Sequence, residues 1–368
     1  MLLATSAIVV AVASCGSRTG LLVDTTIPAD AAADAPLDSA VPCVPGTFDF
    51  QLALTQLMFV IDRSGSMQFD LAGNRNQPRA NWRWTILHDA LAQTITSFDE
   101  QISMGAKFFP ERDVHDGSDA AEACRTESGV GIPPARGNAQ KILAAFTPDP
   151  IGGTPTAEAV RLAAQFLTGN RGVARTIVLA TDGAPNCNGD LTSSSCICTS
   201  RDPVTGLPSC GGRNGAYSCL DDKRTIQTIQ DIASGQNIPI YVIGLGNEST
   251  TFLSTLDAMA VAGGRPRPTT PRHYNVQSPA DLTDALQSIR DTVAKCTYLT
   301  PSAPSNPDDI LVQISGVTVL RDPAKTNGWD WVDQAYGELA LFGDACTKAQ
   351  AATAVSATAV GGVVTCTQ

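Results

Sequence analysis

The sequence contains little of what catalytic and nucleic-acid-binding proteins commonly depend on. Its three histidines, His88, His115 and His273, stand in no nucleophile or metal-ligand motif. Aromatic residues make up only 5% of the chain, which indicates no platform for base stacking. Lysine and arginine form no cluster and the formal net charge is −11, so a nucleic-acid surface or a polybasic membrane patch is disfavoured.

The motifs of common enzyme classes are missing as well. The sequence has no GxSxG elbow, no HExxH motif and no glycine loop with a phosphate-binding lysine. It does have the means to fold, because 368 residues with 43% hydrophobic content can form one large domain or two modest ones. An acidic chain of this kind suits cationic or metal-bridged partners better than anionic ones.

The chain begins with an apolar segment that is too short to span a bilayer. Met1–Ser14 carries no charge and ends in small residues before Cys15. It resembles a bacterial lipoprotein signal, which would make Cys15 the lipidated first residue of the mature protein, although Val12 replaces the usual leucine and no Lys/Arg region precedes it. The alternative is a cleaved secretory signal. Either interpretation predicts an envelope protein, lipid-anchored at the outer membrane or else periplasmic or secreted.

Eleven cysteines agree with an oxidising compartment. With Cys15 set aside for lipid, ten remain, an even number that allows five disulfides. We expect Cys346 to pair with Cys366, and Cys43 with Cys296. Five further cysteines crowd together, and their odd number requires an outside partner, for which Cys124 is the candidate. A zinc site through Cys196 and Cys198 is the alternative, but no CxxC is repeated. The crowded cysteines are Cys187, Cys196, Cys198, Cys210 and Cys219.

The order of patterns along the chain predicts four regions. Residues 1–15 form the signal segment, and residues 16–47, rich in Ala, Asp, Thr and Pro, form a flexible tether. Residues 48–296 form a doubly wound α/β domain with a mostly parallel sheet, and residues 297–368 form a small β-rich module. Strands are expected at Gln56–Ile61, Ser103–Phe109, Thr176–Thr181, Pro239–Gly244 and His273–Val276.

Amphipathic segments between these strands predict the helices of the α/β domain. Apolar residues recur at steps of three and four from Trp84 to Phe98 and from Val160 to Leu167. Two long polar segments, Asp113–Asn138 and Ala184–Tyr217, are expected to be surface insertions, and the Cys-rich insertion (184–219) should stand beside any ligand site. Further helices are expected at Ala139–Phe146, Asp222–Ser234, Thr250–Met259 and Pro279–Lys295.

Oxygen-bearing side chains follow the first of these strands. Asp62, Ser64 and Ser66, in the order DxSxS, stand on the turn after the apolar run Leu57–Ile61. Short carboxylate and hydroxyl side chains on a rigid turn suit Mg²⁺, which prefers about six oxygens at roughly 2.0–2.1 Å. A turn that only caps the next helix is the alternative.

Two later segments supply matching donors. Thr154 follows Gly152 and Gly153 and precedes a proline that favours the start of a helix. Asp182 directly follows the buried strand that ends at Thr181. Each could be a simple cap or turn residue, but the carboxyl ends of parallel strands share one edge of a sheet, where open α/β folds bind ligands.

Together the three segments resemble the von Willebrand factor type A domain with its metal-ion-dependent adhesion site. The resemblance covers roughly Leu54–Cys296 and implies that Mg²⁺, or Mn²⁺ or Ca²⁺, is bound by five residues, with Thr156 as an alternative to Thr154. It also implies a binding protein that is not an enzyme, whose cation accepts an Asp or Glu carboxylate from a protein or matrix partner. In some relatives binding moves the final helix, here Pro279–Lys295. The implied ligands are Asp62, Ser64, Ser66, Thr154 and Asp182.

Two other functions remain open from the sequence. One is a structural scaffold of the envelope in which the metal only braces the loops. The other, less favoured, is a metal-dependent hydrolase.

Overall fold

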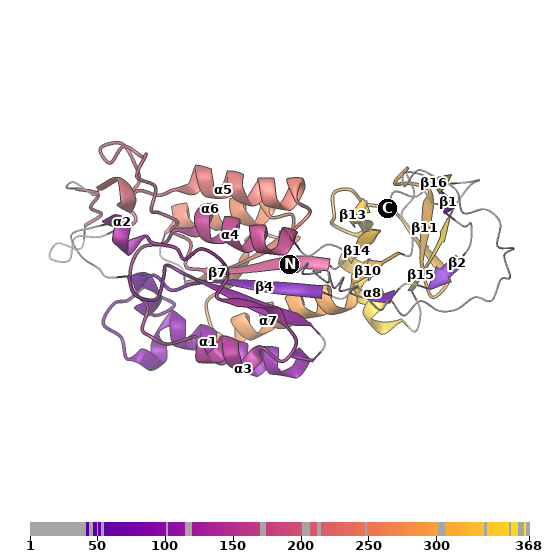
Figure 1. Cartoon of the computed structure of the whole chain (residues 1–368), viewed down its shortest axis with the longest axis horizontal. Coiled ribbons are helices and arrows are strands. Elements are labelled where there is room, and N and C mark those ends of the chain that lie inside the picture. Colours follow the sequence, from indigo (N-terminus) through magenta and orange to yellow (C-terminus); the bar gives the residue numbers. More distant parts are fainter. Residues whose placement is uncertain are drawn as a thin grey trace, which may run out of the picture. The chain divides into compact units, whose positions relative to one another are not determined.

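The structure is a computed structural model, in which the described residues form a larger α/β domain and a smaller module of three antiparallel sheets (Figure 1). The signal segment and the tether up to residue 41, with Cys15, lie outside the described residues. The residues described are 42–43, 47–49, 51–52, 55–100, 102–114, 120–169, 174–200, 207–211, 215–246, 249–300, 306–334, 337–352, 355–359 and 364–365.

The α/β domain is built on a six-stranded sheet. Five strands run parallel, and the edge strand β6 pairs antiparallel with β5. All five strands expected from the sequence are present, and β6 is additional. In spatial order the strands are β6 (Ile132–Ala135), β5 (Ser103–Phe109), β4 (Thr55–Asp62), β7 (Ala174–Thr181), β8 (Ile240–Leu245) and β9 (Tyr274–Val276).

Helices cover both faces of the sheet, with α1, α3 and α7 on one side and α4, α5 and α6 on the other (Figure 1). The short helix α2 and the 3₁₀ turns η1 to η4 lie in the connections, and the π-helical turn η5 extends α5. The bounds are α1 (Arg83–Ile95), α2 (Ala120–Ala123), α3 (Ala139–Ala144), α4 (Thr156–Thr168), α5 (Asp222–Gln230), α6 (Thr250–Ala262), α7 (Pro279–Lys295), η1 (Gly65–Gln68), η2 (Arg79–Asn81), η3 (Thr96–Phe98), η4 (Gly215–Ser218) and η5 (Asp231–Gly235).

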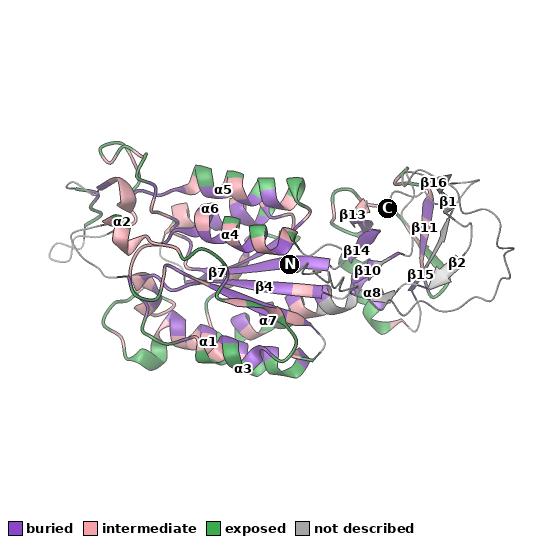
Figure 2. Cartoon of the chain, in the orientation of Figure 1, coloured by how far each residue is buried: buried purple, intermediate pink, exposed green. Residues whose placement is uncertain are grey.

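The central strand β4 explains why two helical layers are needed. Its side chains alternate between faces: Phe59 and Ile61 pack in the core with α1 and α7, while Met58 and Val60 pack in the core with α4 and α6. Both sets are buried, so the strand has no solvent face, as is typical of a parallel sheet. Figure 2 shows β4 and β7 largely buried between helices whose outer faces are exposed.

The C-terminal module is β-rich, as expected, and its sheets are antiparallel. It also includes strands from residues that precede the α/β domain. β3 pairs with β10, β2 with β15 and β1 with β16, so residues 42–52 contribute strands to this module rather than only a tether. The strands are β1 (Pro42–Cys43), β2 (Thr47–Asp49), β3 (Gln51–Leu52), β10 (Thr297–Leu299), β11 (Ile310–Ile314), β12 (Val317–Val319), β13 (Gly328–Asp333), β14 (Glu338–Phe342), β15 (Val355–Ala359) and β16 (Val364–Thr365), and the helix is α8 (Gly343–Ala351).

Four disulfides lie within the described residues. Cys124 pairs with Cys187, which confirms the expected outside partner of the crowded cysteines. The other four crowded cysteines form two bonds with each other, Cys196–Cys219 and Cys198–Cys210, and are therefore not zinc thiolates in this structure.

The pairing expected at the ends of the α/β domain is wrong. Cys296, which follows α7 directly, bonds to Cys346 in α8, whose Cα lies 5.4 Å away. This bond excludes both the Cys43–Cys296 and the Cys346–Cys366 pairs. Spacing alone does not determine connectivity, because the partner depends on which elements the fold brings together.

Among the described residues, no helix has the length and apolar character needed to cross a membrane.

Candidate functional site

The site lies at the carboxyl ends of β4 and β7, the two central strands. The chain leaves β4 toward β5 on one side and leaves β7 toward β8 on the other, so the strand order reverses between them. Open α/β sheets bind ligands in the crevice at such a switch point. Asp62 ends β4 and Asp182 directly follows β7, so the fold brings these two sequence-predicted residues to the same crevice.

The DxSxS loop is organised by hydrogen bonds to its aspartate. The Ser64 amide donates to Asp62 Oδ1 over 2.8 Å, which fixes the turn after β4. The hydroxyls of Ser64 and Ser66 lie 3.1 Å apart, with η1 carrying Ser66 back toward Ser64. All three predicted donors of this loop are thus joined in one short network.

The second oxygen of Asp62 is held by a residue that the sequence analysis missed. Thr181, the last residue of β7, donates its hydroxyl to Asp62 Oδ2 over 2.7 Å. Asp62 is fully buried, and burial, followed by the nearby Asp182 carboxylate, raises its pKa to about 7 despite these hydrogen bonds. Two carboxylates this close are stable together as anions only if positive charge lies beside them.

The loop that carries Thr154 is attached directly to the DxSxS loop. The Gly65 amide donates to the Gly152 carbonyl over 3.1 Å, and the Ile151 amide donates to the Arg63 carbonyl over 2.9 Å. Gly152 has a φ of +88°, and a Cβ there would lie 2.6 Å from a backbone oxygen, so this position requires glycine. Thr154 is buried just before α4.

Thr156, the alternative to Thr154, begins α4 and is also buried. Its hydroxyl donates to the Thr154 carbonyl over 3.4 Å, so its polar group already has a partner within the loop.

Asp182 is held by one oxygen and leaves the other without a hydrogen bond. Arg83 at the start of α1 donates Nη1 to Asp182 Oδ2 over 3.0 Å, and the carboxylate side chain is only 4% exposed. No donor among the described residues reaches Asp182 Oδ1, which is buried. A buried carboxylate oxygen without a donor is costly unless a cation or water satisfies it.

The Cys-rich insertion stands beside the site, as expected. The backbone amide of Thr154 donates to the side-chain oxygen Oδ1 of Asn186 over 2.7 Å. The backbone amide of Asn186 donates in turn to the Thr154 carbonyl over 3.0 Å. The Cys124–Cys187 disulfide packs on Gly153, where a Cβ would lie 2.5 Å from the Cys187 sulfur. Both long insertions are therefore fastened to the Thr154 loop, a role for Asn186 that no sequence motif indicated.

The donor set suits a hard divalent cation. Asp62 and Asp182 supply carboxylates, and Ser64, Ser66 and Thr154 supply neutral hydroxyls, all short side chains on turns at one edge. Each Asp62 oxygen accepts one hydrogen bond and retains a second lone pair. The buried, unsatisfied Asp182 Oδ1 is the observation that fits a bound cation best.

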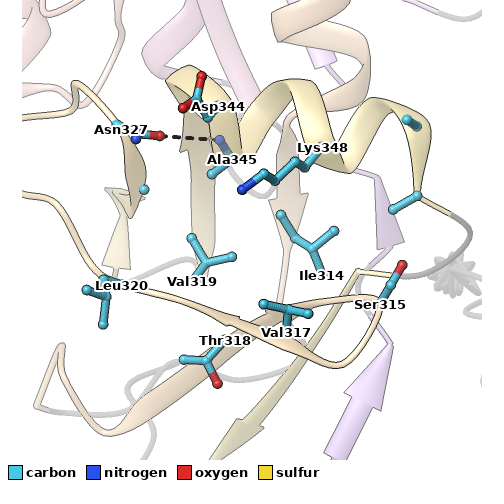
Figure 3. A pocket seen from close by; sticks show the side chains of 13 residues that line it. Ile314, Ser315, Val317, Thr318, Val319, Leu320, Asn327, Asp344, Ala345 and Lys348 are labelled. Carbon is cyan, nitrogen blue, oxygen red and sulfur yellow. Dashed lines mark hydrogen bonds between the residues drawn. The ribbon is translucent and has the colours of Figure 1, made fainter.

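A hollow of the described residues lies elsewhere, in the C-terminal module. It has a volume of about 620 Å³ between β12 and α8. In Figure 3 the side chains of Ile314, Val317 and Val319 lie below α8, and Lys348 extends from that helix over them. Its lining is mostly apolar and contains no cluster of oxygen donors, so it is unrelated to the chemistry at the sheet edge.

No protein-family profile and no curated protein sequence matches the chain. Among solved structures, it is similar to the PilB minor pilin from Streptococcus sanguinis (18% identity, TM-score 0.46, covering 66% of this chain and 62% of that one). It is also similar to the pilus adhesin SpaC from Lactobacillus rhamnosus GG (15% identity, TM-score 0.45, covering 84% of this chain and 39% of that one). A third similar structure is the vWF domain of the type V pili tip protein Mfa5 from Porphyromonas gingivalis (15% identity, TM-score 0.40, covering 66% of this chain and 96% of that one).

The chain therefore spans less than two thirds of the pilin and of the adhesin SpaC. The fold itself is defined by the strand order, with β4 and β7 at the centre, an antiparallel edge strand and three helices on each face. The α/β domain has a doubly wound, mostly parallel α/β fold, which is the arrangement that the resemblance to the von Willebrand factor type A domain implies.

Proposed function

We propose that the protein is a divalent-cation-dependent binding module of the cell envelope. A cation, Mg²⁺ or alternatively Mn²⁺ or Ca²⁺, is held by Asp62, Ser64, Ser66, Thr154 and Asp182, and it accepts a carboxylate oxygen from a partner. The observation that carries this proposal is the buried Asp182 oxygen without a donor, beside a second buried aspartate.

The chemistry of the donors favours binding of an acidic partner. Three of the five donors are neutral hydroxyls, so the bound cation keeps much of its positive charge. An Asp or Glu of a protein or matrix ligand then makes a charge-assisted contact, which is strongest where water is excluded. The residues of this chain position the cation, and the two insertions contact the loop that carries Thr154.

A bracing role for the metal is less well supported. The DxSxS and Thr154 loops are already joined by the Gly65–Gly152 hydrogen bond, and the Cys124–Cys187 disulfide fastens the insertions. Loops held in these ways need no cation to stay together, so the cation is better explained as the ligand-binding element.

Catalysis is not supported by the described histidines. His88 pairs with its neighbour Asp89 on the surface of α1, and His273 is buried against Asp257 of α6. Neither contacts the five donors, and His115 lies outside the described residues. The lipid anchor on Cys15 completes the proposal, since it would tether the binding site to the outer membrane.

Calorimetric titration with Mg²⁺ and with Mn²⁺ tests the cation site. The wild type should bind one cation and Asp62→Ala should bind none, whereas Asp322→Ala, a surface aspartate of the C-terminal module, should bind like the wild type. No binding by the wild type, or equal binding by Asp62→Ala, would refute the site.

Capture of envelope and matrix proteins with and without EDTA then separates adhesion from bracing. Adhesion predicts that EDTA releases a specific acidic partner while the melting temperature hardly changes. Loss of folding without loss of a specific partner would support the bracing role instead.

A further inference from the structure

Arg83 places a permanent positive charge inside the candidate cation site. It is the first residue of α1, and its side chain is only 1% exposed. Its Nη1 lies 3.0 Å from Asp182 Oδ2 and 3.3 Å from the backbone oxygen of Ser66. The guanidinium therefore contacts two residues predicted to bind the cation, the side chain of Asp182 and the backbone of Ser66.

The surrounding residues form a fitted space for this guanidinium. A Cβ on Gly246, which follows β8, would lie 2.5 Å from Nη2 and 2.7 Å from Nε, so only glycine leaves room there. The Phe69 ring lies on another side, 5.7 Å from the guanidinium carbon. The Arg83 amide donates to the Phe69 carbonyl over 2.9 Å, which fixes the backbone from which the side chain extends. Three separate segments, around η1, after β7 and after β8, thus position one charge.

We propose that Arg83 is a resident cation that sets the charge balance of the metal site, an inference that rests on the proposed function. Asp182 is then shared: Oδ2 remains with Arg83, and Oδ1 faces the divalent cation. The two aspartates together carry a charge of −2, which Arg83 partly neutralises, so a bound divalent cation leaves the site with net positive charge.

This balance has two opposite consequences. Repulsion between Arg83 and the bound cation weakens cation binding, because like charges at short range in a poorly solvated site interact strongly. The same surplus of positive charge strengthens binding of a carboxylate to the loaded site. Arg83 therefore lowers the affinity of the site for the cation and raises the affinity of the loaded site for an acidic partner. A residue that only stabilised the fold would not move the two affinities in opposite directions.

The test compares Arg83→Gln, which removes the charge, with Arg83→Lys, which retains it. The first measurement is Mn²⁺ affinity of the full chain by calorimetry. The second is the affinity of acetate for the Mn²⁺-loaded protein, followed by the relaxation of water protons. Arg83→Gln should bind Mn²⁺ about tenfold more tightly and acetate about tenfold more weakly than the wild type. Arg83→Lys should stay within about threefold of the wild type in both.

The melting temperature of each variant, measured with EDTA, shows whether it is folded. If a folded Arg83→Gln binds Mn²⁺ no more tightly than the wild type, or binds acetate equally well, the inference is wrong while the cation site stands. If Arg83→Gln does not fold, Gly246→Ala is tested in its place, since the added methyl group displaces the guanidinium without removing it. Like Arg83→Gln, this variant should bind Mn²⁺ more tightly and acetate more weakly than the wild type. If neither the wild type nor any variant binds Mn²⁺, the proposed function falls and the role of Arg83 falls with it.

Discussion

The aspartates at the carboxyl edge of the α/β sheet and those of the C-terminal module differ in how far the protein satisfies their carboxylate oxygens with hydrogen bonds. In the module, Asp322 accepts hydrogen bonds from the amides of Ala324, Thr326 and Asn327 and from the Thr326 hydroxyl. These bonds, first that of Asn327, lower the pKa of Asp322 to about 2. At the sheet edge, burial raises the pKa of Asp62, and Asp182 keeps a buried oxygen without a donor.

The difference separates a structural aspartate from a ligand-binding one. Asp322 lies on an exposed turn, and the protein itself satisfies its charge. Asp62 and Asp182 lie in a crevice where the protein supplies fewer hydrogen bonds than two buried carboxylates need. Both regions contain Asp beside Ser or Thr, so residue type alone does not distinguish them. The number of unsatisfied buried oxygens does.

The largest effect should come from a core tryptophan, since the α/β domain buries Trp84 and the module buries Trp329 and Trp331. Trp329 of β13 is buried edge-on against Trp331, with ring centroids 5.6 Å apart. Trp329→Ala should lower the free energy of unfolding by about 3–5 kcal/mol, because a large core side chain leaves a cavity. Urea unfolding measures this loss, and Mn²⁺ affinity of the folded protein should stay unchanged. Altered affinity would mean that the two regions are coupled.

The disulfides offer the next contrast. Replacing Cys124 and Cys187 by serine, or Cys296 and Cys346 by serine, should lower the free energy of unfolding by about 2–4 kcal/mol in either case. Only the first pair packs on the Thr154 loop, so only its loss should also weaken Mn²⁺ binding. Calorimetry on both variants checks this, and equal Mn²⁺ affinity in the two would remove the disulfide from the account of the site.

Single hydroxyls give a smaller effect. Ser66→Ala removes one predicted neutral ligand and should weaken Mn²⁺ binding about tenfold, since each lost ligand must be replaced by water. Thr326→Val is the matched change in the module, where the hydroxyl serves Asp322 alone. Mn²⁺ titration of both variants should show the loss only for Ser66→Ala, and a similar loss for Thr326→Val would contradict the distinction between the regions.

The smallest effect concerns pH. All three histidines precede the C-terminal module, and His273 is buried in the α/β domain with Nδ1 2.6 Å from Asp257 Oδ1. Burial lowers its pKa below the usual 6.5, so the folded state binds the proton less readily than the unfolded state. Stability from this residue is complete above pH 6.5 and is lost as the pH falls below it, by at most about 1.4 kcal/mol per pH unit.

Tryptophan fluorescence during urea unfolding at pH 7 and pH 5 measures this loss. His273→Asn should show a smaller decrease between the two pH values than the wild type. An equal decrease in both proteins would assign the pH dependence to other groups.

The sequence predicted most of the α/β domain because its signals are local. The strand expected at Ser103–Phe109 and the helix at Pro279–Lys295 have the observed bounds, since apolar runs and helical periodicity mark buried elements directly. β6 was missed because Pro133 and Pro134 favour a loop, and only an edge strand accommodates them. The strands of residues 42–52 were missed because they are short and pair with residues far along the chain.

The sequence predicted the loops that carry the candidate ligands, but not the residues that hydrogen-bond to those loops. Motif order pointed to the DxSxS, Thr154 and Asp182 segments, whereas Arg83, Thr181 and Asn186 contact them only through the fold. Arg83 reads as an ordinary polar residue at a helix start, and its burial depends on Gly246, which is far away in the sequence. The Cys296–Cys346 bond shows the same limit, since its partners meet only where α7 ends beside α8.

An anomalous difference map from a crystal soaked in Mn²⁺ tests the central claim most directly. The account predicts one strong peak at the carboxyl edge of the sheet, roughly 2.1 Å from the Ser64 and Ser66 hydroxyls. Thr154, Asp62 and Asp182 Oδ1 should complete its protein surroundings, directly or through water. A map without a peak among these three loops, or with its main peak at the Asp322 turn, would contradict the account.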